Sequence, residues 1–111
     1  MTTRTFQILL ALAEGPLHGY GIRQRVEERT EGEVRLGSGT LYEGVHRLLE
    51  RGAVREVEPP DHEPASGGPP RRYYALTDEG REALRAELRR MEAVVRWARR
   101  RDLLTEAPLG P

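Results

Sequence analysis

SGTLYEGVHRLLERG, residues 38–52, is the stretch on which the fold depends. Apolar residues recur in it at helical spacing and predict a helix with one buried face: Leu41, Val45, Leu48 and Leu49. The opposite face is polar: Gly39, Thr40, Glu43, His46, Arg47 and Glu50. Gly52 is placed to close the helix, and the spacing of Thr40 and Glu43 predicts a capping box at its start. A helix that reads the DNA major groove needs such a face, and an ordinary solvated helix also has one.

The flanking sequence predicts further helices and a β-hairpin. The expected elements are, in order, helices over residues 4–14 and 18–30, a short strand over 33–36, the helix just described, and strands over 53–58 and 71–76 around a Gly- and Pro-rich loop, residues 59–70. In the second helix, Tyr20, Ile22 and Val26 are expected to face inward. This order is that of a winged helix-turn-helix, which is mainly α with a small β-hairpin, an α+β fold.

A long last helix is expected over residues 77–104, capped by Thr77. Its apolar residues alternate at spacings of four and three, as in a dimerisation seam. The first helix is apolar on both sides, so a second subunit is expected to cover the side that carries Ile8 and Leu12. The predicted dimer interface comprises Phe6, Ile8, Leu12, Leu84, Leu88, Met91, Val95 and Ala98. We therefore expect a winged domain over residues 1–76, a dimerisation helix over 77–104 and a flexible tail over 105–111.

Composition excludes several classes of function. The 111 residues contain no Cys, so disulfides and thiolate metal sites are ruled out. The 18 basic residues balance the 18 acidic ones, which gives a formal net charge of zero. His18, His46 and His62 lack metal-ligand spacing, and neither a Ser/His/Asp set nor a phosphate-binding glycine loop is present. The chain shows no membrane-spanning run and no signal peptide. We expect a cytoplasmic protein that is not an enzyme and uses neither metal nor cofactor.

Candidate DNA-binding residues lie on the helix of residues 38–52 and at the base of the hairpin: Ser38, Thr40, Tyr42, Glu43, His46, Arg47, Arg71 and Arg72. Arg47 can pair with guanine or a phosphate, or form a surface ion pair with a neighbouring glutamate. Hydroxyls at the helix start can meet a phosphate, cap the helix, or do both. Arg71 and Arg72 are adjacent and are expected to face opposite ways.

The motifs in their order resemble the PadR family of bacterial transcriptional regulators. The matching pieces are GPLHGYGI at residues 15–22, GTLY at 39–42, LLERG at 48–52, RRYYALT at 71–77 and Gly80. The resemblance implies a homodimeric winged-helix repressor that binds a palindromic operator and is released by a small aromatic effector. An effector pocket is then expected in the dimer seam, lined by Ile8, Leu12, Met91, Val94, Val95 and Trp97.

A different class of function also fits the composition. A winged helix can serve as a protein-interaction module that never touches DNA. The zero net charge and the acidic residues Asp61 and Glu63 near the hairpin tip favour that alternative. The salt dependence of binding to duplex DNA distinguishes the two.

Overall fold

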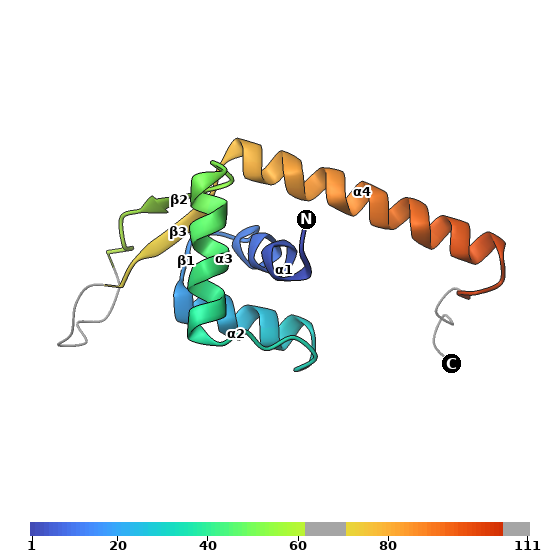
Figure 1. The fold of residues 1–111 in the computed structure, drawn as a ribbon, viewed down its shortest axis with the longest axis horizontal. Coiled ribbons are helices and arrows are strands. Elements are labelled where there is room, and N and C mark those ends of the chain that lie inside the picture. The colour runs from blue at the N-terminus through green and yellow to red at the C-terminus, as the bar shows by residue number, and fades with distance from the viewer. Residues whose placement is uncertain (62–70, 106–111) are drawn as a thin grey trace.

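The computed structural model describes residues 1–61 and 71–105 (Figure 1). Its elements are α1 (Thr3–Leu12), β1 (Leu17–His18), α2 (Gly19–Arg29), α3 (Ser38–Glu50), β2 (Val54–Val57), β3 (Tyr73–Leu76) and α4 (Asp78–Arg100). The three helices, the hairpin and the long last helix that the sequence predicts are confirmed, with ends that differ by a few residues. Residues 62–70 of the expected loop over 59–70, and residues 106–111 of the expected tail over 105–111, lie outside the described residues.

The small sheet has a strand that the sequence pattern did not reveal. Its order is β1-β3-β2, antiparallel throughout, with Leu17 opposite Tyr74 and Val57 opposite Tyr73. Residues 33–36, expected to be a strand, form none. The Thr30 hydroxyl instead accepts from the Val34 amide at 3.0 Å, which ties that segment to the end of α2. The Val34 amide is therefore satisfied by the C-cap residue of α2 and not by a strand partner.

The core surrounds α1 on every side. Ile8 is 0% exposed and Leu12 is 1% exposed, because α2, α3, α4 and β3 all pack against this helix. The expectation that a second subunit must cover Ile8 and Leu12 is therefore wrong. Phe6 also belongs to this core, and its assignment to a partner surface fails for the same reason.

The two ends of α3 are capped in different ways. The N-cap is Gly37, which has no side chain to cap with, so the expected capping box of Thr40 and Glu43 is wrong. The C-terminal end matches the prediction, because Gly52 adopts φ +73° and follows the C-cap. The Ala53 amide donates to the Leu48 carbonyl at 2.9 Å, which satisfies one of the last carbonyl groups of the helix.

The start of α4 is tied to the end of α3. Thr77 caps α4 by accepting from the Gly80 amide at 3.0 Å, as expected, and its own amide donates to the Ala53 carbonyl at 3.1 Å. Within α4, all of which is described, only Gly80 and Leu84 are buried. Beyond them the helix leaves the body of the molecule as a long arm (Figure 1). Leu84 lies in the protomer's own core, so its assignment to a dimer interface is wrong.

Candidate nucleic-acid interface

The outer face of α3 is exposed as predicted, whereas its inner face is locked into the core. Leu41, Val45 and Leu48 are each no more than 2% exposed. The polar residues of the opposite face are all exposed: Ser38, Gly39, Thr40, Tyr42, Glu43, His46, Arg47 and Glu50. Because the buried face holds the helix in place, this row of polar groups is presented in a fixed orientation.

Charged side chains on this face are paired with one another. Glu43 lies 3.7 Å from Arg47 and 3.8 Å from Arg4 of α1, and His46 lies 2.8 Å from Glu50. The surface ion pair expected as the alternative for Arg47 is therefore present. Such exposed pairs contribute only about 0–1 kcal/mol, so each can be exchanged for a stronger contact with a phosphate or a base.

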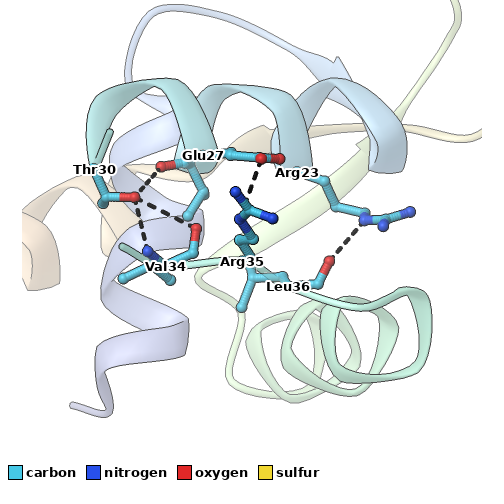
Figure 2. A network of polar contacts seen from close by, with 7 residues as sticks. Arg23, Glu27, Thr30, Val34, Arg35 and Leu36 are labelled. Carbon is cyan, nitrogen blue, oxygen red and sulfur yellow. Dashed lines mark hydrogen bonds and ion pairs between the residues drawn. The ribbon is translucent and has the colours of Figure 1, made fainter. Parts of the chain in front are cut away.

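Arg23 of α2 holds the turn that leads into α3, a role that the sequence analysis missed. Its Nε donates to the Leu36 carbonyl at 2.7 Å (Figure 2). Its Nη1 donates to the Ser38 hydroxyl at 3.3 Å. A signal was present in the sequence, because helical spacing places Arg23 beside the buried Gly19 and Val26.

Further contacts fix the same turn. Figure 2 shows the Thr30 hydroxyl bonded to the chain on both sides of the turn, and Arg35 reaching back to Glu27 of α2. The Thr30 hydroxyl donates to the Val26 carbonyl at 2.8 Å, and the Arg35–Glu27 distance is 3.4 Å. The angle between α2 and α3 is thus set by side-chain bonds to backbone carbonyls as well as by apolar packing.

The base of the hairpin brings the remaining predicted residues together. Arg71 and Arg72 both line one open hollow with Tyr42 of α3, although adjacent residues were expected to face opposite ways. The reason is that both arginines precede β3, so the alternation of a pleated strand does not apply to them. Arg72 lies 3.8 Å from Glu56 of β2, and Arg71 lies 3.0 Å from the His18 ring.

Tyr74 forms part of the same hollow from the central strand. Burial raises the pKa of the Tyr74 hydroxyl, and the nearby Tyr42 and Glu56 raise it further. This hydroxyl therefore remains protonated, and able to donate a hydrogen bond, at neutral pH.

An apolar stripe on α4 is left without cover in the single chain. Its exposed members are Leu88, Met91, Val94 and Trp97, with Val95 and Ala98 half-buried beside them. The Arg101 guanidinium lies over the Trp97 ring, 5.2 Å from its centre. With Ile8 and Leu12 buried in the core, the residues predicted for an effector pocket that remain accessible are Met91, Val94, Val95 and Trp97.

The described part of the chain carries neither a cluster of metal-ligating side chains nor a membrane-spanning helix. Among residues 1–61 and 71–105, no three His, Cys, Asp or Glu side chains gather as a metal site would require. None of the helices described is both long enough and apolar enough to span a bilayer.

Residues 8–86 match the Transcriptional regulator PadR-like family. An uncharacterized 37.1 kDa protein of transposon TN4556 from Streptomyces fradiae is 39% identical over 84 residues, which are 76% of this chain and 21% of that protein. The chain thus spans about a fifth of the length of this curated relative.

Two solved structures share the fold. A PadR family transcription regulator from hypervirulent Clostridium difficile has a TM-score of 0.71 at 23% identity, over 89% of this chain and 97% of that chain. Bacillus subtilis PadR, solved in complex with operator DNA, has a TM-score of 0.65 at 22% identity, over 78% of this chain and 47% of that chain. Since the family match covers well over half of the sequence, the chain belongs to the PadR-like family of transcriptional regulators.

Proposed function

We propose that the protein is a homodimeric, sequence-specific repressor that binds a palindromic operator through α3 of each subunit. The single observation that carries this proposal is the exposed polar face of α3, held rigid by its buried opposite face. Arg47 is the residue best placed to read a base, because an arginine pairs with the major-groove edge of guanine through two hydrogen bonds. It would exchange its exposed partner Glu43 for that base.

The other predicted residues are assigned to contacts with the DNA backbone. Ser38 and Thr40 lie in the first turn of α3, where amide groups and the helix dipole favour a phosphate. Tyr42 of α3 and Arg71 line the hollow beside the helix, and His46 lies one position before Arg47 on the exposed face. Such contacts fix the register of the protein on DNA, while base contacts specify the sequence.

Dimerisation is assigned to α4. Residues 1–76 would form the DNA-binding unit, and residues 77–104 would pair with the same helix of a second copy. The support is the exposed stripe, in which Val94 is 63% exposed and Trp97 is 45% exposed, because an uncovered apolar stripe of this kind marks an interaction surface. A two-fold pair of α3 helices then has to match major grooves about 34–36 Å apart.

Release by a small aromatic effector is the finer part of the proposal. The effector would bind at the α4 seam near Met91 and Trp97 and change the separation of the two reading helices. A ligand that stacks on Trp97 has to displace the guanidinium of Arg101, which now covers that ring. If a panel of phenolic compounds changes neither Trp97 fluorescence nor operator affinity, this part of the proposal is wrong.

The test of DNA reading uses duplexes that the protein enriches from genomic DNA, with affinity measured by fluorescence anisotropy. Arg47→Ala should weaken binding to the enriched duplex by about 1–3 kcal/mol. Arg89→Ala, an exposed arginine on α4, is the matched control and should leave affinity unchanged. Absence of any duplex binding at low salt would refute the proposal and favour the protein-interaction module.

A further inference from the structure

Glu43, on the outer face of α3, lies between two arginines that come from different helices. Its Oε1 is 3.7 Å from Nη2 of Arg47 on α3 and 3.8 Å from Nη2 of Arg4 on α1. We propose that Glu43 passes wholly to Arg4 when Arg47 binds DNA, which makes Arg4 a positioning residue that frees Arg47 to read a base. The inference rests on the DNA binding proposed above and adds Arg4, a residue outside the reading helix.

The Glu43 carboxylate is committed to neither arginine. Direct bonds between these groups span about 2.7–3.2 Å, and both of the measured distances are longer. Both arginines also approach the same carboxylate oxygen, and the Glu43 side chain is exposed, so it has room to rotate. A shift of roughly 1 Å would bring this oxygen into direct bonding range of either partner.

The two arginines differ in how freely they can leave Glu43. The side chain of Arg47 is 50% exposed, whereas that of Arg4 is 24% exposed. The stem of Arg4 lies over Gly44, because a Cβ built at that glycine would be 3.4 Å from both Cγ and Cδ of the arginine. A packed stem restrains a long side chain, since its apolar part would return to water if the side chain moved away. Arg47 is therefore the arginine that departs, and Arg4 is the one that stays.

Arg4 has a second donor available to the carboxylate. Its Nε is buried and has no hydrogen-bond partner among the residues that the structure describes. Nε and Nη2 lie on one edge of a guanidinium, and such an edge binds a carboxylate through two parallel bonds. Because Nη2 of Arg4 already faces Glu43, a carboxylate that moves closer can accept from both nitrogens. The DNA-bound arrangement would thus also satisfy this buried donor.

The balance of charge explains why DNA binding needs this transfer. Once Arg47 pairs with a base, Glu43 would otherwise remain as an uncompensated negative charge facing the phosphates. Within residues 1–61 and 71–105, Arg4 is the only other cation that forms an ion pair with Glu43. An Arg4–Glu43 pair is neutral as a unit, so it offsets the repulsion that the acid alone would exert on DNA. The packing of α1 against α3 is what brings Arg4 to this face (Figure 1).

Substitutions of Arg4 separate its charge from its packing. Arg4→Met keeps an unbranched apolar stem over Gly44 and removes both the charge and the buried Nε, so the variant should melt as the wild type does. Arg4→Lys keeps the positive charge on a similar stem. If Arg4→Met melts at a lower temperature than the wild type, Arg4→Gln gives the same loss of charge with a polar end group.

The test measures affinity for the duplex enriched by the wild-type protein, in the wild-type and Glu43→Gln backgrounds. In the wild-type background, Arg4→Met should weaken binding about threefold for each subunit bound, and Arg4→Lys should bind nearly as tightly as the wild type. In the Glu43→Gln background, Arg4→Met should change affinity by less than about twofold, because the acid that Arg4 compensates is gone. Arg85→Met breaks the ion pair with Glu82 on α4, and this matched control should bind normally in both backgrounds.

Three other results would overturn the proposal. If Arg4→Met weakens binding equally in both backgrounds, Arg4 acts on DNA without Glu43, and a slope of log affinity against log salt lowered by about 0.9 per subunit would identify a direct phosphate contact. If Arg4→Met binds as its parent does in both backgrounds, Arg4 takes no part in DNA binding. A loss of affinity that follows a lower Tm, in Arg4→Met and Arg4→Gln alike, would leave Arg4 with a structural role only.

Failure of this inference differs from failure of the proposed function. If the wild type binds no duplex, the proposed function is wrong and the transfer of Glu43 falls with it. If the wild type binds and Arg47→Ala binds more weakly, while Arg4→Met behaves identically in both backgrounds, only the transfer of Glu43 to Arg4 is wrong.

Discussion

Replacing Gly80 with alanine would place a methyl group against the backbone where α4 starts. The added Cβ would lie 2.8 Å from the Ala53 carbonyl carbon and closer still to its oxygen. Carbon atoms pack at roughly 3.5–4.0 Å, and a backbone segment at the end of a helix cannot rotate away as a side chain can. We therefore expect Gly80→Ala to push the first turn of α4 away from Ala53.

The size of the effect follows from the contacts that this movement breaks. The Thr77 amide donates to the Ala53 carbonyl at 3.1 Å, and the Thr77 hydroxyl donates to the Gly52 carbonyl. Each bond contributes about 1 kcal/mol, and overpacking costs about 1–3 kcal/mol more. Alanine regains about 1 kcal/mol of helix propensity. The free energy of unfolding should fall by about 2–4 kcal/mol, which lowers Tm by roughly 10–20 °C.

Two other helical glycines give a graded comparison. A Cβ at Gly44 would lie 2.7 Å from Cδ1 of Ile8, the end of a side chain that can adjust, so Gly44→Ala should cost about 1–2 kcal/mol. Nothing lies within 4 Å of a Cβ at Gly39, and Gly39→Ala should be neutral or stabilising by about 0.5 kcal/mol. Thermal melts followed by circular dichroism at one fixed protein concentration measure the series, because the proposed dimerisation would make Tm depend on concentration.

The order of the three variants is the test. A Gly80→Ala protein as stable as wild type, or one more stable than Gly39→Ala, would refute the close backbone contact between α4 and Ala53. The same result would also show that the contact at Ala53 does not hold the start of α4 against the end of α3.

Three further predictions concern the proposed DNA and dimer surfaces. Glu43→Gln should raise affinity for non-specific duplex about threefold in anisotropy titrations, because it frees Arg47 and removes a charge that repels phosphates. Arg23→Ala should lower Tm and weaken operator binding about tenfold, because the Leu36 carbonyl loses its bond and the start of α3 loosens. Met91→Glu should convert the proposed dimer into single chains at micromolar concentration, as measured by light scattering, because a charge is placed in the apolar stripe.

Matched controls accompany these variants. Glu82→Gln removes an acid paired with an arginine on α4 and should leave DNA affinity unchanged. Arg25 lies two residues after Arg23 on α2, and its side chain pairs with the exposed Glu14. The Arg25→Ala variant should therefore bind the operator normally. An Arg23→Ala protein that matches Arg25→Ala in affinity would show that the turn needs no such support.

The sequence alone determined the features that depend on neighbours along the chain. The apolar spacing of α3, the glycine at its C-terminal end and the threonine that caps α4 are local signals, because helical hydrogen bonds and caps join residues three to five apart. The polar outer face of α3 could be predicted for the same reason, whereas the PadR motifs were recognised by their order along the chain.

The tertiary structure decided what depends on residues far apart in the chain. Leu17 and His18 become a strand only because β3 pairs with them, and two residues carry no strand signal of their own. Ile8 and Leu12 needed no second subunit, because elements from four parts of the chain close around α1. Arg71 meets His18 across 53 residues of sequence, and no periodicity relates two such positions. Local bonding therefore determined the helices, and long-range packing determined which side chains were left to face a ligand.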